Sequence, residues 1–220
     1  MEWCQVKNTQ TCVPSKRTRG KAEMEERILE TTDRLFYGQG IRAIGVDTIA
    51  AETGISKRTL YNYFTSKNAL IAAYLSRRIR PIAGSDAPPA EQILGVFERL
   101  EHTFASRGFR GCPFVNAVAE LGEHPARAIA ANFKEGRRVW FRDRLIDLGI
   151  RDAEGLATQL SLLVDGAIAA ALVRNDAAMA AAAREAARTL LRSAGVRFAS
   201  TGKTGKRRST RRGPAPAPKR

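Results

Sequence analysis

Side chains that commonly carry catalysis or bind metals are scarce in this chain. It contains two histidines and three cysteines among 220 residues. His102, Cys112 and His124 do not have the spacing of a zinc site, and no glycine-rich nucleotide-binding motif follows a strand. We therefore predict that the protein is not an enzyme and that it has no metal site and no cofactor.

Long apolar runs and strand patterns are scarce as well. No apolar run approaches the roughly 20 residues that cross a bilayer, and the N-terminus has no secretory h-region. Three cysteines without a framework spacing favour a reducing compartment, so we expect a cytoplasmic protein with no membrane partner. No stretch alternates apolar and polar residues as strands do, and the sequence therefore predicts an all-α fold.

Positive charge is abundant, and its distribution is uneven. The formal net charge is +15. Residues 14–80 carry 13 basic and 7 acidic side chains, and residues 199–220 carry 8 basic and none acidic. Residues 81–198 are nearly neutral, with 15 basic and 14 acidic side chains. Excess charge on either side of a neutral middle predicts a polyanionic partner such as nucleic acid.

The stretch AAETGISKRTLYNYFTSK, residues 50–67, predicts two short helices joined at a glycine. Gly54 stands where the chain must turn sharply, and Ser56 is a favourable N-cap for the second helix. Leu60 and Phe64 are four residues apart and share one face, which we assign to the core. The opposite face carries side chains that can hydrogen-bond bases and phosphates, namely Lys57, Arg58, Tyr61 and Asn62. This arrangement is typical of a helix-turn-helix DNA reader.

Apolar periodicity predicts helices along the rest of the chain. Helices are expected at residues 22–37, 46–53, 56–64, 66–80, 90–106, 114–121, 126–148, 153–174 and 177–194. The PIAGSDAPP stretch, residues 81–89, is either a linker or a loop within one helical body. Residues 14–21 are either a frayed end or an arm that contacts DNA phosphates or the minor groove.

The block IGVDTIAAETGISKRTLYNYFTSKNAL resembles the DNA-binding domain of the TetR family of bacterial transcriptional regulators, from about Met24 to Leu75. Beyond Pro81, only the GCPFVNAVAE segment and the alanine- and leucine-rich final helices are similar to some members. The resemblance implies a TetR-like fold, with an N-terminal three-helix helix-turn-helix DNA-binding domain followed by a helical ligand-binding and dimerisation domain. The expected divisions are a disordered head at 1–15, the DNA-binding domain at 16–66, the effector-binding and dimerisation domain at 67–198, and a disordered basic tail at 199–220.

The resemblance also implies roles for individual residues. Lys57, Arg58 and Asn62 would face the major groove, while most of the others would anchor phosphates, Lys67 through an exposed amine. Asp47 departs from many relatives, which have a cation early in that helix. The full set of expected DNA-binding residues is Thr48, Ser56, Lys57, Arg58, Thr59, Tyr61, Asn62, Tyr63 and Lys67.

The middle and final helices have distinctive compositions. The last two are rich in small and apolar residues, so they either pack within one subunit or form half of a four-helix dimer interface, as relatives in the TetR family do. Aromatic residues concentrate in the middle helices, where they either form an ordinary core or, by analogy with the family, line a pocket for a small, largely apolar effector. These aromatic residues are Phe97, Phe104, Phe114, Phe133, Trp140 and Phe141.

Three hypotheses of function follow from the sequence. The leading one is a homodimeric transcriptional repressor that a small molecule releases from a palindromic DNA operator. The second is a sequence-tolerant architectural DNA-binding protein driven by its basic tails, which would bind any duplex with similar affinity. The third is a small-molecule-binding helical protein whose helix-turn-helix has no affinity for DNA even at low salt.

Overall fold

The computed structural model describes residues 16–82 and 86–198, where its regular elements are all α-helices. The predicted all-α fold is therefore confirmed. The first helices are α1 (Lys16–Gln39), α2 (Val46–Thr53), α3 (Lys57–Tyr63) and α4 (Lys67–Arg78). They are followed by α5 (Pro89–Phe104), α6 (Pro113–Leu121), α7 (Ala126–Asp147), α8 (Ala153–Arg174) and α9 (Met179–Ser193).

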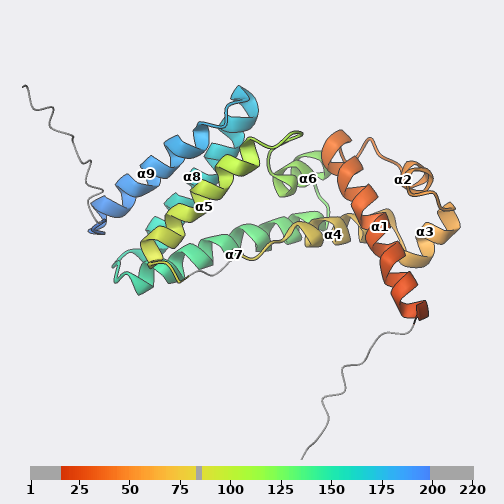
Figure 1. Cartoon of the computed structure of the whole chain (residues 1–220), viewed down its shortest axis with the longest axis horizontal. Coiled ribbons are helices and arrows are strands. Elements are labelled where there is room, and N and C mark those ends of the chain that lie inside the picture. The colour runs from red at the N-terminus through yellow and green to blue at the C-terminus, as the bar shows by residue number, and fades with distance from the viewer. Residues whose placement is uncertain (1–15, 83–85, 199–220) are drawn as a thin grey trace, which may run out of the picture.

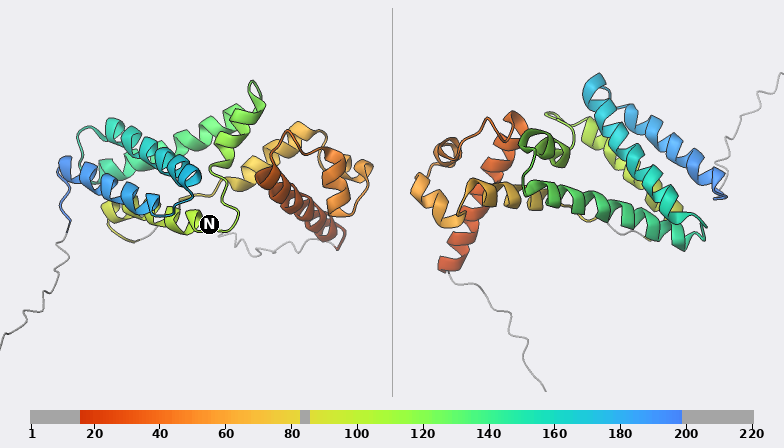
Figure 2. Two further views of the ribbon diagram at one scale, coloured as in Figure 1. Left: turned by 90° about the horizontal axis from the view of Figure 1, so that it is seen from above. Right: turned by 180° about the vertical axis from the view of Figure 1, so that it is seen from behind.

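The helices form an elongated molecule with two lobes. Figure 1 shows α1–α4 at one end, which we call the N-terminal lobe, and α5, α8 and α9 at the other. We call α5–α9 the C-terminal lobe. Within it, α7 starts beside α4 and runs lengthwise to the far end, and α6 lies beside the N-terminal lobe (Figures 1 and 2). The described chain therefore presents α2 and α3 at one extremity, far from α9.

The core of the N-terminal lobe follows the apolar stripe of α1. Ile28, Leu35 and Phe36 recur at helical spacing and are buried, as the periodicity predicts. Thr32 is the polar member of this stripe, and its hydroxyl donates to the carbonyl oxygen of Ile28 at 2.7 Å, so its burial leaves no unsatisfied donor. Tyr74 of α4 enters the same core and meets Phe36 edge-on, with ring centroids 5.6 Å apart.

The start of α1 differs from the expectation. The helix begins at Lys16 instead of residue 22, so residues 16–21 form its first turns where a frayed end or an arm was expected. Four of these six residues are lysine or arginine, which are good helix formers, and this is consistent with extending the helix through the basic stretch. The expected disordered head (1–15) and basic tail (199–220) lie outside the described residues.

The turn between α2 and α3 has the geometry that its sequence predicts. Gly54 adopts a left-handed conformation with φ of 75°. The N–H of Gly54 donates to the carbonyl of Ala51, and the N–H of Ile55 donates to that of Ala50, each at 3.0 Å. Ser56 then caps α3, because its hydroxyl oxygen accepts the N–H of Thr59 at 3.0 Å. These bonds fix the direction in which α3 leaves the turn.

One helix contributes to two cores. Ala126 and Ala130 at the start of α7 are buried with the N-terminal lobe, whereas Phe141 and Leu145 near its end are buried with α5, α8 and α9. In the second core Phe141 stacks with Phe97 of α5 at a centroid distance of 6.4 Å. The helix α7 therefore joins the lobes through side-chain packing as well as through the chain.

The composition of α8 corrects one expectation. The helix α8 has 22 residues and a mean hydropathy of 1.8 in its most apolar window. By length and composition alone it could cross a membrane. The expectation that no apolar run approaches that length is therefore wrong. This helix packs against α5, α7 and α9, and its Asp165 bonds Lys134 and Arg137 of α7. Only 33% of that window is buried, so much of its apolar surface has no cover within one chain.

Candidate nucleic-acid interface and effector pocket

The outer face of α3 is polar and basic. Leu60 holds the inner face with 1% of its surface exposed, whereas the adjacent Tyr61 is 40% exposed. The side chains expected to face the major groove, Lys57, Arg58 and Asn62, are all exposed as well. Because positions i, i+1, i+4 and i+5 share one side of a helix, these residues form a single surface beside Tyr61.

An acidic side chain lies within this surface. The Lys57 amine donates to the carboxylate of Asp47 on α2 at 3.0 Å, and both side chains are more than half exposed. The hydrogen bond to Asp47, followed by its charge, raises the pKa of Lys57 above its ordinary value. By contrast, Arg58 and Asn62 form no hydrogen bond or ion pair through their side chains with any residue of the described chain, so their donors remain available.

The expected phosphate anchors occupy different environments. Thr48 of α2 is exposed, while Tyr63 is half-buried and packs against the N-terminal core. The hydroxyls of Ser56 and Thr59 lie 2.8 Å apart at the start of α3. The Ser56 hydroxyl oxygen is thus already used in capping the helix, and its role in the fold is independent of any ligand.

Lys67 differs from the expectation of an exposed amine. Its side chain is half-buried, and its amine donates to the carbonyl oxygen of Ile41 at 2.7 Å. The amine also lies 5.9 Å from the centroid of the Phe36 ring. Burial lowers the pKa of Lys67, against an opposing effect of the Glu120 carboxylate. The amine therefore supports the turn after α1.

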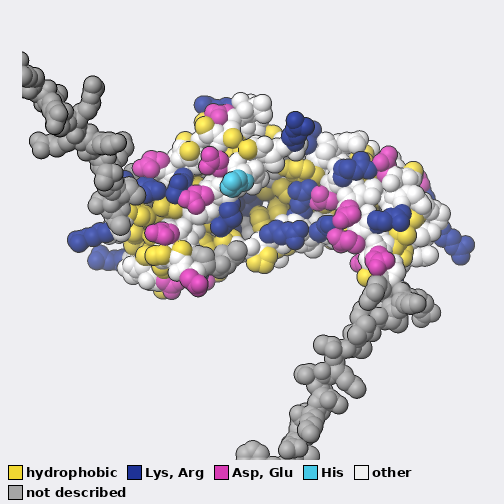
Figure 3. Space-filling view, in the orientation of Figure 1, with side chains coloured by type: hydrophobic (Ala, Val, Ile, Leu, Met, Phe, Trp, Pro, Cys, Tyr) yellow, Lys and Arg dark blue, Asp and Glu magenta, His cyan; other side chains and the backbone are white. Residues whose placement is uncertain are grey.

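A pocket of about 680 Å³ opens between the lobes, within the size range of small-molecule sites. Two of the six aromatic residues expected to line a pocket do so, because Phe114 of α6 and Phe133 of α7 stack in its wall with centroids 3.9 Å apart. Figure 3 shows hydrophobic side chains next to Lys and Arg side chains in the hollow between the lobes. We call this site the inter-lobe pocket.

The other four aromatic residues belong to the core of the C-terminal lobe. Phe97 and Phe141 are fully buried, Phe104 is 8% exposed, and Trp140 packs on the same cluster. None of them lines the inter-lobe pocket. These four residues form the ordinary core that was the alternative interpretation.

Arginines in the inter-lobe pocket were not identified from the sequence. The lining includes five of them, Arg77, Arg78, Arg80, Arg99 and Arg137, and a single carboxylate, Asp33. Arg78 binds that carboxylate through two nitrogens, at 2.5 and 2.7 Å, which links α4 to α1. Each residue resembles an ordinary surface arginine in the sequence, and only the packing of α4, α5 and α7 brings them together.

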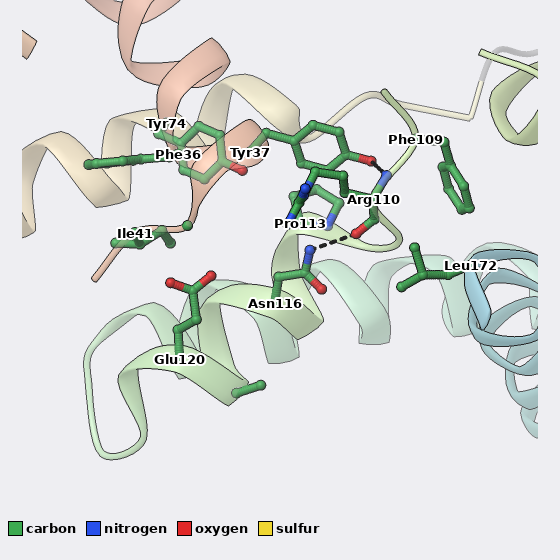
Figure 4. Close-up of a pocket in the computed structure, with 12 residues that line it drawn as sticks. Phe36, Tyr37, Ile41, Tyr74, Phe109, Arg110, Pro113, Asn116, Glu120 and Leu172 are labelled. Atoms are coloured by element: carbon green, nitrogen blue, oxygen red, sulfur yellow. Dashed lines mark hydrogen bonds between the residues drawn. The ribbon is translucent and has the colours of Figure 1, made fainter. Parts of the chain in front are cut away.

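A second pocket of about 480 Å³ lies where α1 and α4 meet α6 (Figure 4). The Tyr37 hydroxyl accepts the N–H of Arg110 at 2.9 Å and donates to the carbonyl of Gly111 at 3.0 Å. The Asn116 amide donates to the Arg110 carbonyl at 2.8 Å. These bonds attach the loop before α6 to the N-terminal lobe.

Two residues at the end of α6 and just after it each bond the N-terminal lobe. The Glu120 carboxylate points towards the turn after α1 (Figure 4) and accepts the N–H of Arg42 at 3.0 Å. The His124 ring accepts the N–H of Ala126 at Nδ1, so its Nε2 carries the hydrogen that Asn68 of α4 accepts at 3.0 Å. The lobes are therefore joined by directed polar contacts.

Comparisons with known proteins agree with this architecture. The family model for bacterial regulatory proteins of the tetR family matches residues 28–74. The TetR-family transcriptional regulator SCO4454 of Streptomyces coelicolor is 31% identical with a TM-score of 0.74, and the match covers 79% of this chain and 96% of that protein. The tetR transcriptional regulator sav143 of Streptomyces avermitilis is 34% identical with a TM-score of 0.66, and the match covers 78% of this chain and 97% of that protein.

Curated relatives match over shorter lengths. The HTH-type transcriptional repressor KstR2 of Mycobacterium tuberculosis is 34% identical over 89 residues, which make up 36% of this chain and 44% of KstR2. The alignments with the first curated relatives from the same organism span 37% of those proteins. Regulators of this kind bind DNA and are typically dimeric. Since the identity with the two Streptomyces regulators extends over almost their whole length, this chain belongs to the TetR family of bacterial transcriptional regulators.

Proposed function

We propose that this protein is a homodimeric transcriptional repressor that binds a palindromic operator and leaves it when a small molecule fills the inter-lobe pocket. The single observation that carries the proposal is the exposed basic surface of α3, presented by a capped turn at one extremity of the molecule. The repressor name of KstR2, a partial relative, supports repression as the outcome. The site of action is the cytoplasm.

In this proposal α3 lies in the major groove. Lys57, Arg58 and Asn62 contact base edges, and a bidentate contact from arginine to guanine contributes roughly 1–3 kcal/mol of discrimination. The phosphate contacts come from Thr48, Ser56, Thr59, Tyr61 and Tyr63, which fix the register without reading sequence. We assign Lys67 to the support of the turn after α1, because its amine already bonds a backbone carbonyl there.

The dimer forms through α8 and α9. An α-helix that is apolar on every side needs cover on every side, and the packing within one chain leaves one face of α8 open. That open face is formed by Leu162, Gly166, Ala169 and Val173, with Leu162 66% and Val173 84% exposed. Exposed alanines on α9 allow a second copy to approach closely, which favours a four-helix interface.

The effector acts by shifting a population of states. The inter-lobe pocket is lined by α1 and α4 from one lobe and by α5–α8 from the other, so a ligand that fills it touches both lobes at once. DNA binding requires two α3 helices about one helical turn, roughly 34–36 Å, apart. A ligand that prefers another spacing of the lobes weakens operator binding by its differential affinity for the two states.

The division of the chain follows from these roles. We propose residues 16–66 as the DNA-binding domain and residues 67–198 as the effector-binding and dimerisation domain. We propose that the basic residues 199–220 add sequence-independent attraction to DNA that salt weakens.

Selection of bound sequences from a random duplex pool tests the DNA half of the proposal. The wild-type chain should enrich a palindrome, and the Lys57→Ala, Arg58→Ala double variant should lose this enrichment. The matched control is Arg107→Ala, Arg151→Ala, which removes the same charge from exposed positions outside α3 and should enrich the wild-type palindrome. A wild-type chain that enriches no discrete site would contradict the proposal.

The eight positive charges of residues 199–220 favour a second candidate function, sequence-tolerant coating of DNA. This function predicts similar affinity for every duplex and loss of binding when those residues are removed. The repressor proposal predicts instead that the truncated chain keeps its palindrome and shows only a weaker dependence on salt. Titration of the truncated chain with matched and scrambled duplexes separates the two.

A further inference from the structure

Arg137 of α7 is a nearly buried cation in the wall of the inter-lobe pocket. Its side chain is only 9% exposed, and it lines the pocket. One terminal nitrogen donates to the Asp165 carboxylate at 2.7 Å and approaches the Ser161 carbonyl at 3.3 Å. The Nε–H has no partner in the described chain. The protein therefore does not fill the hydrogen-bonding capacity of this nearly buried guanidinium, and an acceptor placed beside it in the pocket would be favourable.

The charges around Arg137 are not balanced by the protein. Asp165 accepts from the Lys134 amine at 2.5 Å as well as from Arg137, so one carboxylate faces two cations. Asp33, the single acid in the lining, already holds Arg78 through two bonds. Arg80 and Arg99 are exposed at the same pocket and form no ion pair with a described residue. The pocket therefore offers positive charge without an unused acid.

The rest of the wall is apolar. It is formed by the stacked rings of Phe114 and Phe133 together with aliphatic side chains, namely Ile82, Val96, Leu100, Val164 and Ile168. A neutral apolar ligand would fit this wall but offer no acceptor to the Arg137 guanidinium. A lipophilic cation would find no free carboxylate in the lining and would face five arginines. Neither class of ligand would interact favourably with both the arginines and the apolar wall.

We propose that the effector is an amphipathic carboxylate, whose apolar body lies between the lobes and whose carboxylate accepts hydrogen bonds from the Arg137 guanidinium. Charge-assisted hydrogen bonds are the strong ones, and their strength increases where water is excluded, as it is around this guanidinium. The inference rests on the proposed function in one respect only, namely that the inter-lobe pocket is the effector site.

Three probes with the same chain and different heads test the proposal. Dodecanoate, 1-dodecanol and dodecylamine, each kept monomeric, are titrated into the full chain by calorimetry. We expect dodecanoate to bind at least about tenfold more tightly than the alcohol or the amine. Arg137→Gln should reduce the affinity for dodecanoate to that for the alcohol. Equal affinity of the wild-type chain for acid and alcohol would overturn the proposal whether or not the variant folds.

A control variant on the same helix removes the main competing site. Arg127 and Lys134 of α7 line a second apolar groove of about 330 Å³ with Val115 and Val118, so dodecanoate bound there should bind less tightly to Arg127→Gln. The proposal requires that Arg127→Gln binds dodecanoate as the wild-type chain does. The proposal would be refuted if Arg127→Gln no longer preferred dodecanoate over dodecanol while a folded Arg137→Gln still did.

Operator release is measured separately with the selected palindrome. Dodecanoate that binds through Arg137 without releasing the operator would support the anion site and contradict ligand-controlled repression. Release of the operator by an uncharged or cationic compound, with no preference of the chain for dodecanoate, would overturn only the anion inference. The two proposals therefore fail in different ways.

Discussion

Among individual residues, Asp47 has the most direct effect on the proposed DNA surface. Its carboxylate accepts a hydrogen bond from the Lys57 amine and places a negative charge on a surface that would face DNA. Asp47→Asn should therefore strengthen binding to the operator severalfold. It should also make log affinity fall more steeply with log salt, because the Lys57 charge is no longer neutralised by a carboxylate. Titrations at several salt concentrations measure both.

Glu52→Gln is the matched control for this prediction. Glu52 lies on the same helix and pairs with Arg34 at 2.7 Å, away from Lys57. Its replacement removes the same charge from α2 without breaking a contact to the outer face of α3. If the two variants raised the affinity equally, the pairing between Asp47 and Lys57 would have no specific effect and only the net charge of the lobe would matter.

At the scale of elements, the turn between α2 and α3 depends on the backbone of one residue. A Cβ at Gly54 would meet only the tip of Arg27 at 3.9 Å, so a side chain has room there. The left-handed conformation is nevertheless costly for any other residue, by roughly 1–2 kcal/mol. Gly54→Ala should lower the free energy of unfolding in urea by about that amount and weaken operator binding, since α3 starts three residues later.

Gly136→Ala is a control in which the same substitution should raise stability instead of lowering it. Gly136 lies inside α7, and a Cβ there would meet nothing within 4 Å. Alanine is favoured over glycine in a helix interior by about 0.5–1 kcal/mol, so this variant should be more stable in the same urea experiment. A loss of stability in both variants would indicate that added side chains disturb packing, and that the backbone conformation of Gly54 is not the cause.

Elements with local signals could be predicted from the sequence. The bounds of α8 were expected at residues 153–174, and the structure has them there. Asp152 accepts the N–H of Gly155 at 2.9 Å at one end, and Asn175 adopts φ of 51° at the other. The exposed face of α3 was likewise predictable, because the residues that define it lie within two helical turns.

The inter-lobe pocket could not be predicted in the same way. Asp33 and Arg78 are 45 residues apart, and nothing in either neighbourhood indicates that they bond. Periodicity places Phe97 and Phe133 alike on the inner face of a helix, but it does not tell whether that face meets another helix or a cavity. Phe97 meets Phe141, whereas Phe133 meets a cavity wall, and only the packing of the whole lobe decides between them.

For the molecule as a whole, the open face of α8 determines the proposed assembly. Leu162→Glu would place a charge in the middle of the proposed interface, where burial without a partner is costly. We expect this variant to be monomeric in light scattering at micromolar concentration and to bind the full palindrome much more weakly, because the two half-sites are no longer engaged together.

Ile146→Glu tests whether this effect is specific to the proposed interface. Ile146 of α7 is 57% exposed, close to the 66% of Leu162, but it lies outside α8 and α9. The variant should remain dimeric and keep its affinity for the palindrome. A wild-type chain that is itself monomeric would overturn the proposed assembly, and with it the expected twofold symmetry of the operator.

The sharing of α7 between two cores has a consequence for protein engineering. Modular sensors are often assembled by exchanging the DNA-reading segment of one regulator for that of another. Here a cut after residue 66 would separate α1 from Leu70 and Tyr74 of α4, and it would leave Ala126 and Ala130 of α7 facing a foreign surface. A functional chimera of this protein would have to transfer α4 with the reader and match its contact face on α6 and α7, so the unit of exchange is larger than the unit that reads DNA.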